Sequence, residues 1–187
     1  MKIGRARRFF IWPGAYLFIS LGISSTAMGQ ESKESSPDVG SGAYNLMLRG
    51  LLDHSVPEIG VRELAETSRN YQLLDARARE EYAVSHLAGA TRVGYEDWDE
   101  ERVEELNRDD TVVVYCSVGY RSEKIAERLE ALGFKAVYNL YGGLFEWVNQ
   151  GYPLYREGKP TDQVHAYKRT WGWWLQRGDK VYQGPDE

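Results

Sequence analysis

Short apolar runs alternate with amphipathic stretches between residues 56 and 148. Strands are predicted over residues 56–59, 73–75, 90–93, 111–115 and 136–140. Helices are predicted over residues 44–52, 61–67, 79–82, 99–106, 121–132 and 144–148. The clearest helix is 121–132, because Ile125, Ala126, Leu129 and Leu132 recur with the helical period before Gly133.

Strands that alternate with helices predict an α/β fold with a central parallel sheet and helices on both faces. Residues 112–114 are three successive valines, which suits a central strand that is buried on both sides. In such a sheet, binding sites lie beyond the carboxyl ends of the strands. The segment after Tyr115 is therefore where chemistry is expected, and it begins with the one cysteine of the chain, Cys116.

The cysteine loop joins the predicted central strand to the clearest helix. It consists of Cys116, Ser117, Val118, Gly119, Tyr120, Arg121 and Ser122. The first N–H groups of a helix have no partners within it, so this geometry favours anions and would hold a thiol as a thiolate at neutral pH. Gly119 lets the loop curl, and Arg121 adds a permanent positive charge. The pattern indicates a nucleophilic site with a covalent intermediate.

These residues resemble a known family. Cys-x-x-Gly-x-Arg-Ser after an apolar strand is similar to the active-site loop of the rhodanese (sulfurtransferase) family. Three further segments resemble family motifs in the same order: 73–77 with 80–82, 85–90, and 141–147. The resemblance runs from about residue 56 to residue 153, within a predicted rhodanese-like domain over 44–154.

The resemblance implies a sulfurtransferase that acts through a persulfide on Cys116. A small sulfur-donor anion such as thiosulfate would load the thiolate, and a thiol or a protein acceptor would take the sulfur. It implies no organic cofactor and no metal. Ser117, Val118, Gly119, Tyr120 and Arg121 are the expected substrate-binding residues, and Asp75, Arg77 and Ser122 are expected to support them.

Alternatives stay open for several of these residues and for the function. Asp75 with Arg77 also fits a structural ion pair, and Arg121 also fits the partner of an acid. A non-enzymatic sulfur carrier or partner-binding module is the second hypothesis. An arsenate or phosphate enzyme is the third, but related enzymes of that kind have a seven-residue loop, whereas Arg121 here ends a six-residue one.

The first residues have the pattern of an export signal. The basic residues Lys2, Arg5, Arg7 and Arg8 precede an apolar run over 9–23, and Ala27 and Gly29 suit a cleavage site. This predicts a signal peptide over 1–29 and a periplasmic or secreted protein. A retained membrane anchor is the alternative, although the run is shorter than the roughly 20 residues of a membrane span. Whether the export route is twin-arginine stays open. The polar residues 30–43 are expected to form a flexible tether.

Composition limits the remaining function classes. The formal charge is −5, and without residues 1–29 it is −9, from 19 basic and 28 acidic residues. This argues against a nucleic-acid binder that works by neutralising phosphates. One cysteine and three histidines exclude an intramolecular disulfide and a zinc-finger site.

Residues 155–187 form an aromatic and basic C-terminal arm. Its pattern allows a helix over 164–176. We expect its aromatic side chains to pack on the domain; docking to a partner protein or a membrane interface is the alternative.

Overall fold

A computed structural model describes residues 37–67 and 70–184. The predicted signal peptide and residues 30–36 of the predicted tether lie outside the described residues. Within the described ranges, no helix has both the length and the apolar character that crossing a bilayer requires.

The described part of the predicted tether, 37–43, is fixed on the domain, so that prediction is wrong for these residues. Val39 is buried, and the Gly40 N–H donates to Glu146 Oε1 at 2.8 Å. Helix α1 (Gly42–Leu51) begins within the segment, where Ser41 Oγ accepts from the Tyr44 N–H. The polar composition gave no sign of this contact, because Glu146 lies about a hundred residues away in the sequence.

Five parallel strands form the central sheet in the order β1-β5-β4-β2-β3. They are β1 (Glu58–Ile59), β2 (Gln72–Asp75), β3 (Thr91–Arg92), β4 (Thr111–Tyr115) and β5 (Ala136–Leu140). Strand β4 is central, because Val112 is in register with Gln72 on one side and Val137 on the other. The predicted strand bounds are confirmed for β4 and β5 and are slightly too long for β1 and β3.

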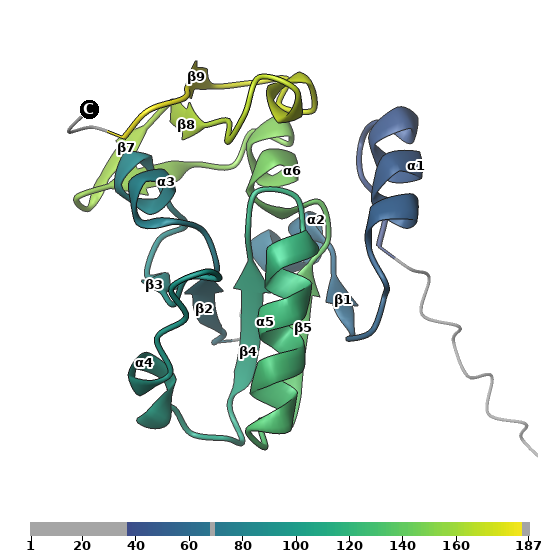
Figure 1. Ribbon diagram of the computed structural model, residues 1–187. Coiled ribbons are helices and arrows are strands. Elements are labelled where there is room, and N and C mark those ends of the chain that lie inside the picture. The colour runs from purple at the N-terminus through teal and green to yellow at the C-terminus, as the bar shows by residue number, and fades with distance from the viewer. Residues whose placement is uncertain (1–36, 68–69, 185–187) are drawn as a thin grey trace, which may run out of the picture. The chain divides into compact units, whose positions relative to one another are not determined.

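Helices cover both faces of the sheet, as predicted (Figure 1). Besides α1 they are α2 (Val61–Glu66), α3 (Arg79–Val84), α4 (Glu101–Glu104), α5 (Tyr120–Ala131) and α6 (Gly143–Asn149). Side chains of β4 alternate between two apolar clusters, as the period of a strand requires. Val113 and Tyr115 join the cluster that contains residues of α1, α2 and α6, whereas Val112 and Val114 join the cluster that contains residues of α4 and α5.

The C-terminal arm is built from short strands. Strands β6 (Leu154–Arg156) and β7 (Lys159–Thr161) are antiparallel, and β8 (Gln163–His165) pairs in parallel with β9 (Asp179–Val181). The helix that the pattern allowed over 164–176 is wrong; only a short 3₁₀ turn, η1 (Trp171–Trp173), forms there. Val164 and Ala166 are buried at the two-residue spacing of a strand, and Tyr167 has a φ of 61°, which breaks any helix.

The arm packs on the domain, as expected. Val164 and Leu175 belong to the same apolar cluster as α1 and α6, and the Trp174 ring stacks on Tyr44 with centroids 5.4 Å apart. In Figure 1, β7, β8 and β9 lie beyond the end of the sheet at which β4 points. The arm therefore lies at the edge where Cys116 emerges.

Candidate active site

Cys116 follows β4 directly and lies in the wall of a cavity of about 430 Å³. The side chain is only 1% exposed, so the cavity is what gives the sulfur access to small molecules. Its volume is within the range of small-molecule sites. The lining residues are Leu51, Tyr95, Glu96, Cys116, Ser117, Val118, Tyr120, Arg121, Tyr167, Lys168 and Trp171.

The loop turns so that a main-chain amide points at the sulfur. The Gly119 N–H donates to Cys116 Sγ at 3.1 Å. Gly119 has a φ of 120°, a conformation that side chains disfavour, and it caps the N-terminus of α5. The curled loop predicted from this glycine is confirmed. A donor aimed at the sulfur stabilises negative charge on it.

Helix α6 holds the other side of the loop. Its Leu144 N–H donates to the Cys116 carbonyl at 2.9 Å, and its Phe145 N–H donates to the Ser117 carbonyl at 3.0 Å. Gly143 permits this approach, because a Cβ there would lie 2.6 Å from the Cys116 carbonyl oxygen. The loop is thus fixed between the first turns of α5 and α6.

Ser122 and Asn139 form a buried layer beneath the loop. Asn139 Nδ2 donates to the Gly119 carbonyl at 3.1 Å, and Ser122 Oγ donates to Asn139 Oδ1 at 2.7 Å. Both side chains are fully buried. They hold the carbonyl of Gly119, so that its N–H keeps facing the sulfur. The expectation that Ser122 supports the loop fits this geometry, whereas Asn139 was not predicted.

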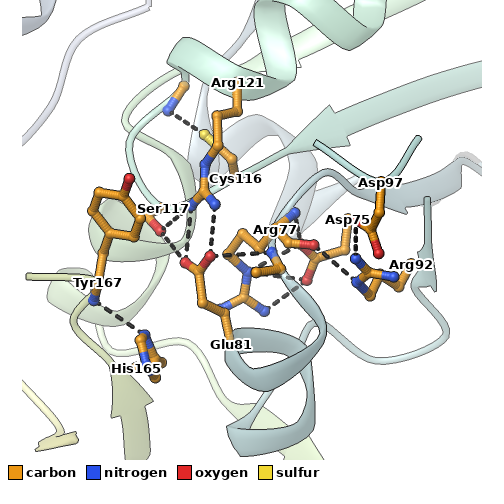
Figure 2. A network of polar contacts seen from close by, with 12 residues as sticks. Asp75, Arg77, Glu81, Arg92, Asp97, Cys116, Ser117, Arg121, His165 and Tyr167 are labelled. Carbon is orange, nitrogen blue, oxygen red and sulfur yellow. Dashed lines mark hydrogen bonds and ion pairs between the residues drawn. The ribbon is translucent and has the colours of Figure 1, made fainter. Parts of the chain in front are cut away.

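Arg121 pairs with the carboxylate of Glu81, which was not among the predicted site residues. Its Nη1 donates to Glu81 Oε2 at 2.6 Å and its Nη2 to Glu81 Oε1 at 2.8 Å. Ser117 Oγ lies 3.0 Å from both Arg121 Nη2 and Glu81 Oε1. Figure 2 shows these three side chains converging beside Cys116. The alternative in which Arg121 partners an acid is therefore confirmed; its part in substrate binding stays a prediction.

In the Arg121–Glu81 ion pair, the hydrogen bonds and charges around each group together shift its pKa more than burial does. Burial raises the pKa of Glu81, but the hydrogen bond and charge of Arg121 lower it further, to about 2. Burial likewise lowers the pKa of Arg121, whereas Glu81 and the charge of Cys116 raise it above the usual value. Both groups are charged at neutral pH.

Asp75 and Arg77 form a second ion pair, wholly buried, which confirms the structural alternative. Arg77 Nη2 lies 2.6 Å from Asp75 Oδ2 and also donates to the Ser85 carbonyl at 2.7 Å. Neither residue lines the cavity. The positive charge of Arg77 nevertheless helps to lower the pKa of Glu81. The buried Asp75–Arg77 pair is therefore linked electrostatically to the Arg121–Glu81 pair.

The arm supplies one wall of the cavity, through Tyr167, Lys168 and Trp171. The Arg121 guanidinium lies 4.9 Å from the centroid of the Tyr167 ring, and Figure 2 shows the two side by side. The Tyr167 N–H donates to His165 Nδ1 at 3.2 Å. Burial lowers the pKa of His165, which favours the neutral ring that can accept this bond.

The structure brings together most of the predicted loop residues. Cys116, Ser117, Val118, Tyr120 and Arg121 line the cavity, while Gly119 contributes its main-chain amide. Sequence reasoning missed Glu81, Asn139 and the arm residues. Glu81 lies in the segment 80–82 that resembles a family motif, and this was a usable signal. The arm residues follow no pattern that points to the loop. Within residues 37–67 and 70–184, no group of His, Cys, Asp and Glu side chains is arranged to hold a metal ion.

Comparison with known proteins agrees on one family. The model for the rhodanese-like domain matches residues 61–150. The chain is 33% identical over 79 residues to "Thiosulfate sulfurtransferase GlpE" of Coxiella burnetii, covering 42% of this chain and 73% of that protein. It is 31% identical over 99 residues to the "Putative sulfur carrier protein YrkF" of Bacillus subtilis, covering 51% of this chain and 53% of that protein. The chain thus spans about half the length of this second relative.

Solved structures give the same fold. A rhodanese-related protein of Thermoplasma volcanium superposes with a TM-score of 0.50 at 28% identity, over 55% of this chain and 100% of that one. The rhodanese-like domain of an Anabaena protein has a TM-score of 0.50 at 25% identity, over 54% of this chain and 80% of that one. The match to the family model ends at residue 150, before the arm.

Proposed function

The chain belongs to the rhodanese-like domain family, and from that premise we propose that it is a sulfurtransferase that works through a persulfide on Cys116. The observation that carries this proposal is the Gly119 N–H aimed at Cys116 Sγ in the wall of a cavity. A thiolate there is a nucleophile that needs no separate base. The persulfide that follows is also an anion, which suits the same donor.

The loading step balances with thiosulfate as the donor. The Cys116 thiolate attacks the outer sulfur of thiosulfate, a new sulfur–sulfur bond forms, and the original one breaks. Sulfite leaves with the bonding electron pair, and the negative charge of the thiolate passes to the terminal sulfur of the persulfide. Support for thiosulfate as donor comes from the name of the Coxiella burnetii relative, a thiosulfate sulfurtransferase.

The unloading step restores the thiolate. A thiophilic acceptor attacks the terminal sulfur, the sulfur–sulfur bond breaks, and its electron pair returns to Cys116 Sγ. Cyanide serves as the acceptor in the test tube, and a thiol or a protein thiol is the proposed acceptor in the cell. The Gly119 amide holds the reacting sulfur in place. The Arg121–Glu81 pair, which Ser117 joins, fixes the loop that carries the sulfur.

We also propose that the protein is exported and acts in the periplasm or outside the cell. The support is the basic, apolar and small-residue sequence of residues 1–29. Amino-terminal sequencing of the protein recovered from its native compartment tests this. A chain that begins near residue 30 supports export with cleavage, and a full-length chain in the cytoplasm contradicts it.

Intact-mass spectrometry after incubation with thiosulfate tests the sulfur transfer. We expect the purified protein to gain one sulfur, roughly 32 Da, and to lose it with release of thiocyanate when cyanide is added. The Cys116→Ser variant should gain nothing, because the chain contains one cysteine. A mass gain that persists in Cys116→Ser, or no gain in the parent protein, refutes the proposal.

A second function is a sulfur carrier that binds a partner. It is favoured by the name of the Bacillus subtilis relative, a sulfur carrier protein, and by Trp173 of the arm, which is 84% exposed. A carrier would accept sulfur from a protein donor but would not turn over thiosulfate. Steady thiocyanate production from thiosulfate and cyanide favours the enzyme, and persulfide formation without that turnover favours the carrier.

A further inference from the structure

The charged residues that line the cavity differ in whether they already have partners. They are Glu96, Arg121 and Lys168. The charge of Arg121 is met by Glu81 through two hydrogen bonds, and Ser117 takes part in the same cluster. A guanidinium that is held in this way contributes little free positive charge to an incoming anion, because the adjacent carboxylate cancels its field.

Lys168 is the cavity's other cation, and it comes from the arm. Its side chain is exposed and makes no ion pair with any residue of 37–67 and 70–184. Its Nζ lies 5.3 Å from the centroid of the Tyr167 ring, which offers a π face but no negative charge. Its charge therefore remains available to a ligand in the cavity.

The main chain around Lys168 is held by several hydrogen bonds, so this lysine has a defined place at the cavity. The Lys168 carbonyl accepts from the Trp171 and Gly172 N–H groups, both at 3.0 Å. The preceding residue, Tyr167, has a φ of 61° and donates its N–H to His165 Nδ1. This turn in the chain places Tyr167 against Arg121 and Lys168 at the cavity wall.

We propose that Lys168 recognises the negative charge of the sulfur donor, so that the arm completes the substrate site of the domain. The inference rests on the proposed sulfurtransferase function and adds the residue that gives it a preference for anions. Glu96 lines the same cavity, and its carboxylate repels an anionic ligand. Lys168 offsets that repulsion, so its charge sets whether anions or neutral molecules are preferred in the cavity. Residues 61–150, which match the family model, do not contain Lys168.

Charge-selective alkylation of the thiol tests the proposal without any enzymatic assay. Iodoacetate is an anion and iodoacetamide is neutral, and both alkylate the single cysteine, Cys116. We expect Lys168→Met to lower the ratio of the iodoacetate rate to the iodoacetamide rate about three- to tenfold, because a nearby charge has been removed. Lys168→Arg should keep the parent ratio. The neutral reagent corrects for any change in the thiol itself.

Lys159→Met is the matched control, because Lys159 is an exposed lysine of the arm that does not line the cavity. It should leave the ratio unchanged. In the thiosulfate and cyanide assay, Lys168→Met should raise the KM for thiosulfate by a similar factor and leave kcat close to that of the parent. A ratio that stays at the parent value in Lys168→Met overturns the role of Lys168. A parent protein that forms no persulfide refutes the proposed function instead, and the alkylation ratio still reports on Lys168.

Discussion

Arg121 and Glu81 are joined by two hydrogen bonds of 2.6 and 2.8 Å, across forty residues of sequence. Arg121 lies in the part of the cysteine loop that forms the first turn of α5, and Glu81 lies in α3. The pair also contacts Ser117 of the loop. The cysteine loop is thus anchored to α3, the helix that follows β2 in the chain, and not only to its own neighbours.

Removing the carboxylate of this pair should weaken the fold. In Glu81→Gln, Arg121 keeps a charge that is only 15% exposed and loses its counterion. Breaking a buried pair from one side costs about 3 kcal/mol. Urea denaturation at pH 7 measures the loss. Glu80→Gln, at an exposed neighbouring position, should change the free energy of unfolding by less than about 0.5 kcal/mol. Equal losses in both variants would contradict the role of the ion pair.

The same carboxylate should make stability depend on acid pH. The pKa of Glu81 is about 2 in the folded protein, against about 4.3 for a free glutamate. Its stabilising effect is therefore complete above about pH 5 and is lost as the pH falls through 4 toward 2. We expect the urea midpoint of the parent protein to fall more steeply between pH 5 and 3 than that of Glu81→Gln. Parallel curves for the two proteins would show that Glu81 does not titrate in this way.

Gly143 should not tolerate a side chain, because of its backbone conformation and because a Cβ there would clash with the main chain of the cysteine loop. Gly143 has a φ of 57° and Gly133 one of 88°, so alanine is strained at both. At Gly133 the added Cβ meets nothing within 4 Å, whereas at Gly143 it lies 2.6–2.8 Å from the main chain of the cysteine loop. Gly133→Ala should cost about 1 kcal/mol, and Gly143→Ala about 3 kcal/mol or more.

Thermal or urea unfolding distinguishes these two glycine variants. Gly143→Ala should also slow the alkylation of Cys116, because displacement of the loop disturbs the Gly119 N–H that faces the sulfur. Gly133→Ala should leave the alkylation rate at the parent value. Two variants with the same stability and the same thiol reactivity would show that the close approach of α6 does not matter.

The two adjacent tryptophans of the arm, Trp173 and Trp174, should contribute very differently to the free energy of unfolding. Trp174 stacks on the buried Tyr44 of α1, whereas Trp173 is 84% exposed. Trp174→Ala should lower the free energy of unfolding by about 2–3 kcal/mol, somewhat less than for a fully buried tryptophan. Trp173→Ala should change it by less than about 0.5 kcal/mol. If Trp174→Ala changes the free energy of unfolding as little as Trp173→Ala does, the arm does not contribute to stability through this stack.

Local patterns were enough for the strands of the central sheet, the helices that cover it and the cysteine loop. Val112, Val113 and Val114 predict a strand that is buried on both faces, and the structure places their side chains in both apolar clusters. Cys116, Gly119 and Arg121 are close in sequence, so their spacing alone predicts a turn into a helix with a thiol at its start. A buried strand and a turn into a helix depend on residues that are close in the sequence, so a local pattern is enough to predict them.

Contacts between distant segments could not be predicted in the same way. Spacing does not show that Glu81, rather than another acid, meets Arg121, because only the folded chain brings α3 to the first turn of α5. The arm shows the same limit: its basic and aromatic residues allowed a helix, but pairing of β8 with β9 and burial of Val164 gave strands instead.

The sequence by itself therefore determined the parallel sheet, the position of the thiol at the end of β4 and the sulfur-transfer family. Only the tertiary structure decided that the charge of Arg121 is taken up by Glu81 and that Tyr167 and Lys168 of the arm form a wall of the cavity. The reason is physical: hydrophobic period and turn chemistry act over a few residues, whereas charge pairing and cavity shape depend on which surfaces meet when the chain is folded.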